Sequence, residues 1–565
     1  MYCLDDLKQK IATELKLAQP HFSYPPNIAL GDFSLVCFDL AAERKQTPVA
    51  LAQELALSLK DKPSLKDYFV DIKAVGPYLN FFVDPAYLAA TLIKAVNSGG
   101  ANYGVNKTGN KQKVMIEYSN GNTHKEYHVG HLRNISYGDA VSKLLAANGY
   151  QAIPVSYIND FGIHTAKTIW NWRRNPVYSE RLEPKGYLLG RCYSEASKLL
   201  VDNEDGKLEV GQIMKDIESR RGENYKTWQK TRQWSIDYFA SIYRELGIKF
   251  VDIFYENEFI TEGRKLVDKF LADGILKRSQ GTIIADLEEY KLGVLPIIRS
   301  DGTALYPVAD LALASAKFGR YKLDKSIYVV DIRQSLYFKQ LFKILEFIGY
   351  QQPLIHLTYD FVTLPEGMMS SRTGTVITYQ DLRDKVLEKS RAETLRRHPD
   401  WSAKRIESVA SKLMIATIKF EMLKVGAEKI ITFNIQEALR FDGYTACYIE
   451  YAYARLQSIL RKQKFSFWTP RPDYRELKEE KEKALLIKLA RYPEIITQAG
   501  LNYDPSELAK YLFELVQMSN DYYHEVNILK SEKKVKIARL ALIKTVSQVL
   551  NNGLKILGLE SLEEM

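Results

Sequence analysis

His128-Val129-Gly130-His131 decides how the fold of this chain is interpreted. The motif follows the apolar run Val114-Met115-Ile116, which predicts a buried strand, and it opens a stretch with helical periodicity. Two imidazoles three residues apart lie on one face of a first helical turn. The free N–H groups and the positive dipole end of that turn attract phosphate, and Gly130 lets a flat ligand approach the backbone closely. The sequence therefore predicts a strand, a tight turn and a helix start that holds phosphate.

The residues around this motif narrow its identity. They read Glu117-Tyr-Ser-Asn-Gly-Asn122-Thr-His-Lys125-Glu-Tyr-His128-Val-Gly-His131-Leu-Arg-Asn. This stretch resembles the ATP-binding signature of class I aminoacyl-tRNA synthetases, and it is more similar to arginyl-tRNA synthetases than to their class I relatives. One departure is visible, because Gly121 stands where that family usually has proline. Alone, a His-x-x-His pair at a helix start is more often a cap than a catalytic pair; the flanks and later motifs favour catalysis here.

Length and composition limit the classes of protein that fit. The chain has 565 residues, enough for several domains, and a net charge of +10 that is compatible with an RNA partner without being diagnostic of one. Its four cysteines are far apart and form no Cys-x-x-Cys pair, so we expect no metal bound by the protein alone. The start lacks the features of a targeting peptide, and no apolar stretch is long enough to span a bilayer. These observations predict a cytoplasmic protein with no membrane partner.

The chain divides by pattern into three parts with predicted bounds 1–108, 109–390 and 391–565. The first mixes helices and strands and ends in a polar segment at 99–112 that predicts a linker. The second alternates strands and helices, as doubly wound parallel sheets do, and is interrupted by a charged helical insertion at about 168–250. The third is almost entirely helical. The predicted fold class is α/β and multidomain, with a Rossmann-like core, an N-terminal α/β domain and a C-terminal all-α bundle.

Both flanking parts resemble the tRNA-binding domains of arginyl-tRNA synthetases. In the first part we expect a helix over 5–17, a helix carrying Leu35 and Phe38 after the turn at Gly31, and a strand over 75–82. The stretch GPYLNFF implies that Tyr78 and Asn80 contact the tRNA elbow, although a strand edge with a buried ring is the alternative. The stretch FDGYTACYIEYAYARLQSIL resembles the anticodon-binding bundle, which implies that tRNA also binds at two residues of that stretch, Tyr448 and Arg455.

The candidate amino-acid pocket is the most discriminating feature. A guanidinium is planar and always charged, so it needs carboxylate and carbonyl oxygens that match its fork of donors. The stretch from Arg299 to Asp310 resembles the family's signature block, and Asp331-Ile-Arg-Gln334 also matches the family. An i,i+4 pair on a helix surface is the alternative for the tyrosine and aspartate of this block. The resemblance implies roles for Asp310 and Tyr306 at the guanidinium, Asn122 and Gln334 at the amino-acid part, and Glu117 as added acidic character.

A second class I signature is expected as a mobile loop that holds pyrophosphate. The candidate is Glu366-Gly-Met368-Met369-Ser370-Ser371-Arg372-Thr373-Gly374, where methionine and serine stand in the two usual lysine positions. The resemblance implies that Lys125 compensates, although a solvated loop lysine and an ordinary Ser-rich turn are the alternatives. The predicted ATP-binding and catalytic residues are His128, Gly130, His131, Lys125, Met369, Ser370, Ser371 and Arg372. Asn159-Asp160-Phe161-Gly162 follows a strand and either lines the site or forms a plain turn, whereas His124 and His164 have no assigned role.

The resemblance covers the whole chain and implies arginine–tRNA ligation. In that reaction L-arginine is activated with ATP and Mg²⁺ to arginyl-adenylate, and the arginyl group passes to the 3′ end of tRNA(Arg) with release of AMP and pyrophosphate. The family also implies a monomer that needs bound tRNA for activation. One alternative is another class I synthetase or a related nucleotidylyl ligase, which would lack the pocket residues. The other is a non-catalytic tRNA-binding paralogue, which would lose His128, His131 or the pocket carboxylate.

Overall fold

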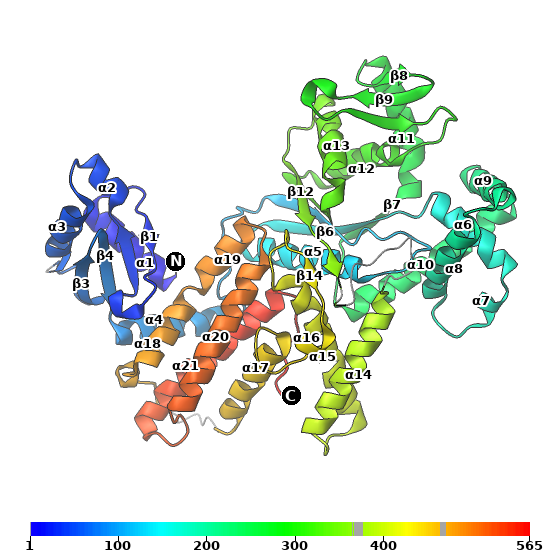
Figure 1. Cartoon of the computed structure of the whole chain (residues 1–565). Coiled ribbons are helices and arrows are strands. Elements are labelled where there is room, and N and C mark those ends of the chain that lie inside the picture. Colours follow the sequence, from blue (N-terminus) through cyan, green and yellow to red (C-terminus); the bar gives the residue numbers. More distant parts are fainter. Residues whose placement is uncertain (1, 61, 364, 366–376, 464–469) are drawn as a thin grey trace.

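The computed structural model describes the chain except residues 1, 61, 364, 366–376 and 464–469 (Figure 1). At the N-terminus a four-stranded antiparallel sheet has the order β1-β2-β4-β3. Its strands are β1 (Phe22–Ser23), β2 (Phe33–Val36), β3 (Phe69–Val75) and β4 (Tyr78–Val83). Its helices are α1 (Cys3–Leu15), α2 (Phe38–Glu43), α3 (Pro48–Lys60) and α4 (Pro85–Gly99).

One local prediction for this region is wrong and another is correct except at its start. Leu35 lies in strand β2 and not in a helix, because it alternates inward and is fully buried; the helix begins only at Phe38. The strand expected over 75–82 is confirmed as β4 from Tyr78 onward, but Val75 ends β3, since Gly76 has a φ of +55° and turns the chain between the two strands. The predicted helix near the N-terminus is confirmed as α1.

The segment expected to be a linker is packed against the C-terminal helices. Tyr103 is only 4% exposed, and its ring stacks on that of Tyr492 at 5.9 Å between centroids. Asn552 donates from Nδ2 to the carbonyl oxygen of Gly100 at 2.8 Å. Polar composition predicted a free connection, whereas one buried tyrosine ring fixes it to the bundle.

The centre of the molecule is a five-stranded, wholly parallel sheet, which confirms the predicted doubly wound core. Its order is β12-β11-β5-β6-β7, so the strand order reverses beside β5, where ligands bind in open α/β sheets. The strands are β5 (Lys113–Glu117), β6 (Gln151–Ile158), β7 (Asp252–Tyr255), β11 (Lys325–Asp331) and β12 (Leu354–Tyr359). The helices α5 (Val129–Ala147), α12 (Tyr306–Tyr321) and α13 (Ser335–Phe347) connect them.

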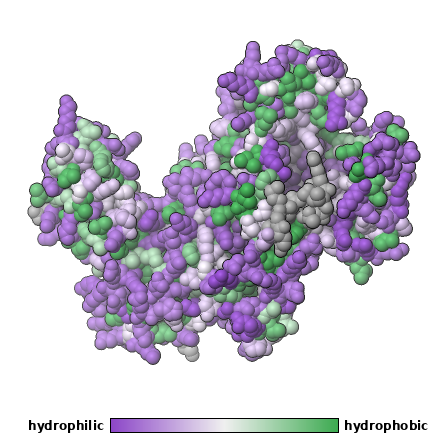
Figure 2. Space-filling view, viewed as in Figure 1, coloured by the Kyte–Doolittle hydropathy of each residue, from purple (hydrophilic) through white to green (hydrophobic). Residues whose placement is uncertain are grey.

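Two modules interrupt the sheet. Between β6 and β7 are α6 (Ile163–Arg174), α7 (Val177–Glu180), α8 (Lys185–Leu199), α9 (Glu204–Glu218) and α10 (Gly222–Glu245). After β7 come α11 (Glu256–Ala272) and a small antiparallel sheet of β8 (Lys277–Ser279), β9 (Thr282–Asp286) and β10 (Val294–Ile298). This second module was not predicted. The space-filling view shows a hollow between the two modules (Figure 2).

The rest of the described chain is largely helical. Its helices are α14 (Tyr379–Arg397), α15 (Ala403–Leu423), α16 (Ile435–Ala438), α17 (Ala446–Arg461), α18 (Glu480–Ala490), α19 (Tyr492–Leu501), α20 (Pro505–Glu525) and α21 (Lys533–Ile556). A short parallel pair of β13 (Val362–Thr363) and β14 (Ile431–Thr432) joins this part to the core. In the described ranges no helix is both long and apolar enough to cross a membrane.

The N-terminal sheet is joined to the C-terminal helices by ion pairs. Lys483 of α18 reaches the buried carboxylate of Asp32 at 3.1 Å, and Lys8 of α1 reaches Glu494 of α19 at 2.5 Å. Helix α4 also packs against α1 on one hand and against α18 and α21 on the other. The N-terminal domain is therefore in direct contact with the C-terminal helices (Figure 1).

Candidate active site

The His128–His131 motif is both a helix cap and a pair of hydrogen-bond donors. His128 precedes α5, and its Nδ1 accepts from the Gly130 N–H at 3.1 Å. In return the His128 N–H donates to His131 Nδ1 at 3.1 Å, and the rings lie 4.0 Å apart between centroids. Because each Nδ1 accepts, each neutral ring carries its proton on Nε2. The predicted shared face of the two imidazoles is confirmed.

Burial keeps both imidazoles neutral. It lowers the pKa of His128 to about 4, helped by the positive charges of Lys125 and Arg333. Burial also lowers the pKa of His131 well below its usual value. At neutral pH the pair therefore offers two Nε2–H donors without adding charge, an arrangement suited to phosphate oxygens.

Two glycines shape the loop around the motif. A Cβ on Gly130 would lie 2.9 Å from Cε1 of His128, so this glycine leaves room for the histidine ring itself. The Gly121 N–H donates to the carbonyl oxygen of Ser119 at 2.8 Å, and its own carbonyl accepts from Asn159 at 3.0 Å. A proline at position 121 would lose the first of these bonds.

Lys125 is a partly buried cation beside the motif. Its Nζ lies 5.3 Å from the centroid of the Tyr193 ring, and no carboxylate of the described residues is within ion-pair distance. Burial lowers the pKa of Lys125, and repulsion from Lys167 lowers it further. Lys167 of α6 was not identified from the sequence; its place in the first turns of the helix after β6 was the available signal. The two lysines bring positive charge to this side of the site.

The second signature loop lies outside the described residues. This applies to the predicted residues Met368, Met369, Ser370, Ser371 and Arg372. The chain that follows returns to the histidine motif, because the Tyr379 N–H donates to the carbonyl oxygen of Tyr127 at 2.6 Å. The Val129 N–H likewise donates to Ile377 at 3.4 Å. Residues 377–379, which follow the undescribed segment, are thereby fixed next to α5.

Helix α12 presents Asp310 at the carboxyl end of the sheet. Tyr306 is its first residue, and Asp310 follows one turn later on the same face, as predicted. The Tyr337 hydroxyl of α13 donates to Asp310. Burial raises the pKa of Asp310 to about 6, and repulsion from Glu117 contributes to the rise. Asp310 is therefore a half-buried carboxylate held in place by a tyrosine.

Glu117 does not supply free negative charge in this structure. Its carboxylate forms an ion pair with Lys317 of α12, and the two side chains are 3% and 1% exposed. Asn120 Nδ2 also donates to it at 3.2 Å. The sequence indicated only the carboxylate, because the lysine that neutralises it lies two hundred residues away. Glu117 thus ties β5 to the helix that carries Asp310.

A second buried carboxyl, Glu256, was missed from the sequence. It begins α11, is 6% exposed, and accepts from Asn159 Nδ2 at 3.1 Å. Burial raises its pKa to about 8, and repulsion from Asp310 and Asp160 adds to the effect. An acidic residue directly after the strand Asp252–Tyr255 was the available signal, because the carboxyl ends of β6 and β7 share one edge of the sheet.

The other predicted pocket residues lie at the same edge but are less tightly held. Asn122 forms a backbone bridge with Asn159. Tyr306 is 57% exposed, and Gln334 is exposed where α13 begins. Neither of these last two side chains hydrogen-bonds to any residue that the structure describes.

Asp160 is a structural anchor and not a plain turn residue. It accepts from the Asn257 N–H at 3.0 Å and from Arg232 Nε at 2.5 Å, and its carbonyl oxygen accepts from Trp228 Nε1 at 2.9 Å. It thereby joins α10 and α11 to the end of β6. His124 is likewise internal, with Nε2 2.7 Å from the Thr231 hydroxyl, as expected for loop structure.

The predicted tRNA contacts differ in accessibility. The exposed Tyr78 ring meets Phe38 edge-on at 6.0 Å. Asn80 is 3% exposed; it accepts from Ser34 Oγ at 2.6 Å and donates to the carbonyl oxygen of Leu30 at 2.7 Å. In the bundle, Tyr448 and Arg455 of α17 both hydrogen-bond to Asn520 of α20. Arg455 also lies near two aromatic rings, Tyr451 at 4.9 Å and Tyr523 at 5.5 Å.

Three family models match consecutive parts of the chain. Residues 4–83 match the arginyl-tRNA synthetase N-terminal domain. Residues 93–434 match the catalytic domain of class I tRNA synthetases (R), and residues 449–565 match the DALR anticodon-binding domain.

Similar proteins cover nearly the whole chain. The arginine–tRNA ligase of Bdellovibrio bacteriovorus is 34% identical over 557 residues, which are 96% of this chain and 93% of that protein. That of Clostridium perfringens is 32% identical over 99% of this chain and 98% of that protein. The Thermus thermophilus arginyl-tRNA synthetase structure has a TM-score of 0.82 at 26% identity and covers 99% of this chain and 100% of its own. With a class I histidine motif, a doubly wound sheet and full-length relatives of one kind, this chain belongs to the arginyl-tRNA synthetase family.

Proposed function

We propose that this protein is an arginine–tRNA ligase. It activates L-arginine with ATP to arginyl-adenylate and transfers the arginyl group to the 3′ end of tRNA(Arg), releasing AMP and pyrophosphate. The observation that carries the proposal is a pair of desolvated carboxyls with raised pKa values, the half-buried Asp310 and the buried Glu256, at the sheet edge that also holds the His128–His131 motif. Ionising two desolvated carboxyls is costly unless a cation joins them, and a guanidinium presents a planar fork of donors to both.

In the first step the arginine carboxylate attacks the α-phosphate of ATP and pyrophosphate leaves. His128 and His131 donate from Nε2 to phosphate oxygens as charge develops, and Gly130 completes the start of the helix beside them. Lys125 and Arg372 balance the charge of the departing pyrophosphate. Ser370 and Ser371 of the signature loop donate to its oxygens, and Met369 contributes to ATP binding. Mg²⁺ enters bound to ATP, because such ions are held mainly through substrate phosphates.

In the second step a hydroxyl of the terminal tRNA ribose attacks the adenylate carbonyl and AMP leaves. The chain contributes positioning and electrostatic stabilisation to both steps. Asp310, Glu256 and Tyr306 engage the guanidinium, while Asn122 and Gln334 orient the amino-acid part. Glu117 acts through its ion pair with Lys317, which holds α12 against β5. Lysine is rejected because it leaves part of this acceptor set unpaired.

The tRNA partner is held at both ends of the chain. Tyr78 exposes its ring for contact with the tRNA elbow, whereas the buried Asn80 holds the turn at Leu30 and acts through it. Tyr448 and Arg455 lie on α17, where aromatic rings and guanidinium groups alternate as they do in many sites for unpaired bases. We further infer a cytoplasmic monomer whose domains are 1–108, 109–390 and 391–565.

The test is ATP–pyrophosphate exchange with each proteinogenic amino acid, with and without tRNA(Arg). We expect exchange with arginine and with no other amino acid, and we expect it only when tRNA(Arg) is present. Exchange with a different amino acid would identify another class I synthetase. Absence of exchange under every condition, with tRNA binding retained, would identify a non-catalytic paralogue.

A further inference from the structure

Lys167 of α6 lies beside Lys125, although the two are far apart in the sequence. The Thr168 hydroxyl is 3.5 Å from the carbonyl oxygen of His124, which places the start of α6 against the loop before the histidine motif. Lys125 is the next residue along that loop and Lys167 the preceding residue of the helix, so their backbones lie within a few residue lengths of each other. Burial lowers the pKa of Lys125, and the positive charge of Lys167 lowers it further, as expected for neighbouring ammonium groups.

Neither lysine is neutralised by a carboxylate. Among the described residues, Lys125 and Lys167 form no ion pair and no hydrogen bond through their ammonium groups. The Lys125 ammonium faces the Tyr193 ring of α8 at 5.3 Å from its centroid, and α8 packs along α6. Both lysines are half-buried, so water only partly screens their repulsion. Two unpaired cations held this close favour the binding of a group with several negative charges.

Lys125 also connects Lys167 to the histidine motif. Burial is the main cause of the lowered pKa values of His128 and His131, and the positive charge of Lys125 contributes to both. Lys125 is therefore a neighbour of both the histidine pair and Lys167. An ATP molecule whose α-phosphate is held by the histidine pair can extend its β- and γ-phosphates along the two lysines.

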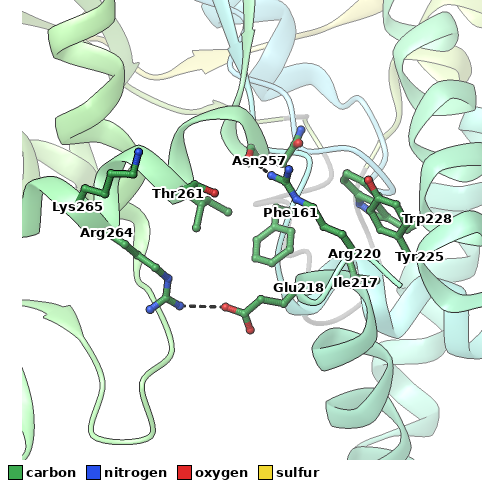
Figure 3. A pocket seen from close by; sticks show the side chains of 11 residues that line it. Phe161, Ile217, Glu218, Arg220, Tyr225, Trp228, Asn257, Thr261, Arg264 and Lys265 are labelled. Carbon is green, nitrogen blue, oxygen red and sulfur yellow. Dashed lines mark hydrogen bonds and ion pairs between the residues drawn. The ribbon is translucent and has the colours of Figure 1, made fainter. Parts of the chain in front are cut away.

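A second group of cations in this part of the molecule is largely neutralised. It lines a cavity between the helical insertion and α11 and consists of Arg220, Arg264 and Lys265 (Figure 3). Arg264 is paired with Glu218 at 2.9 Å, as the dashed line in Figure 3 marks, and Lys265 is paired with Glu262 at 3.0 Å. Of the three, only Arg220 meets no carboxylate of the described residues within ion-pair distance. The unpaired lysines beside the histidine motif are thus better placed to bind a polyphosphate.

The signature loop of this chain carries less positive charge than is usual for class I enzymes. Met368 and Ser371 stand where two lysines are usual, and Arg372 is the only cation between Glu366 and Gly374. Pyrophosphate leaves with several negative charges, so the two missing lysines call for cations elsewhere in the site. Lys125 accounts for one of them and leaves a place for a second.

We propose that Lys167 is a catalytic residue that binds the β- and γ-phosphates of ATP together with Lys125. When the arginine carboxylate attacks the α-phosphorus, the bond to the bridging oxygen breaks and pyrophosphate leaves with the bonding electron pair. The Lys167 ammonium donates hydrogen bonds to this pyrophosphate and transfers no proton. The inference deepens the proposed function and rests on it.

Binding of ATP and of AMP, each with Mg²⁺, tests this contact, because AMP lacks the β- and γ-phosphates. Isothermal titration calorimetry on the full-length protein gives both affinities without arginine or tRNA. Lys167→Met removes the charge and keeps the apolar stem, whereas Lys167→Arg keeps the charge. Lys265→Met is the matched control, since it makes the same change in net charge at an exposed lysine that is already paired.

Lys167→Met should weaken ATP binding by roughly ten- to a hundredfold, the range for one hydrogen bond to a charged group, and leave AMP binding unchanged. It should also slow single-turnover formation of arginyl-adenylate without altering arginine affinity. Lys167→Arg should restore most of the ATP affinity, and Lys265→Met should match the wild type.

Two results would overturn the proposal. Equal losses for ATP and AMP would show that Lys167 has a purely structural role, and an unaltered ATP affinity would show that it makes no phosphate contact. Failure of the wild type to activate arginine would overturn the proposed function instead, because the comparison of ATP with AMP includes no amino acid.

Discussion

Replacing Glu256 with glutamine probes the charge state of the arginine pocket. Glutamine keeps the size of the side chain and an oxygen that can accept from Asn159, but it removes the charge. With a pKa of about 8, the Glu256 carboxyl of the arginine-free protein is about nine-tenths protonated at pH 7. A guanidinium pairs with the ionised form, so arginine binding must expel that proton.

The magnitude follows from this pKa. At pH 7, ionising Glu256 costs about 1.4 kcal/mol, the equivalent of one pKa unit. Arginine affinity should therefore rise about fivefold between pH 7 and pH 8, with nearly one proton released per arginine bound at pH 7. Glu256→Gln should abolish the rise and the release, and at pH 8 it should weaken binding by roughly 2–5 kcal/mol, the usual loss when one partner of a desolvated charge pair is removed.

Isothermal titration calorimetry in buffers of different ionisation enthalpy measures affinity and proton release together. Glu262→Gln is the control, because Glu262 lies on the same helix but is exposed and paired with Lys265 at 3.0 Å. If Glu256→Gln keeps the wild-type pH dependence and proton release, Glu256 does not face the guanidinium and this account of the pocket is wrong.

Three further predictions concern other parts of the molecule. Lys125→Ala should slow single-turnover adenylate formation by roughly a hundredfold while arginine affinity stays unchanged; an unaltered rate would make Lys125 a bystander. Burial raises the pKa of Glu450 to about 8, above its value in the unfolded chain. The protonated carboxyl therefore contributes stability that is lost as the pH rises from about 5 to 8, so the Tm of the wild type should fall over this range. Glu450→Gln should flatten that fall, and parallel Tm profiles of the two proteins would contradict the prediction. Deleting residues 1–84 should leave a folded, ATP-binding protein whose tRNA affinity is weaker and less dependent on salt. Deleting residues 1–108 should in addition lower the Tm, because it removes Tyr103 and uncovers the Tyr492 ring. Equal melting temperatures of the two deletion variants would refute this second expectation.

The parts of the fold that were predicted correctly have strong local signals. The strand before His128, the helix after it and the C-terminal helices each follow a regular period over ten or more residues or carry a motif. Leu35 was placed wrongly because its strand is only four residues long, too short to distinguish strand from helix by pattern. The module of β8–β10 was not predicted for the same reason, because its strands have only three to five residues.

The candidate site could be predicted only where its residues are close together in the sequence. Asp310 follows Tyr306 by four positions, so one helix face is enough to join them. Glu117 and Lys317 are joined only by the fold, and sequence spacing carries no trace of their ion pair. Asn80 shows the same limit. The resemblance implied a tRNA contact for both Tyr78 and Asn80, but Asn80 is buried against the turn at Leu30, whereas the Tyr78 ring is exposed.

The Asp32–Lys483 and Lys8–Glu494 ion pairs fix the distance between the N-terminal domain and the C-terminal bundle. The N-terminal sheet is held by the helical bundle, so the separation between the surfaces that carry Tyr78 and Arg455 is set by protein contacts and not by the RNA. If these two surfaces make the proposed contacts, an RNA whose elbow and anticodon are displaced by one inserted base pair in the anticodon stem cannot satisfy both at once. On this proposal, molecular size, and not nucleotide identity alone, becomes a criterion by which the enzyme selects RNAs.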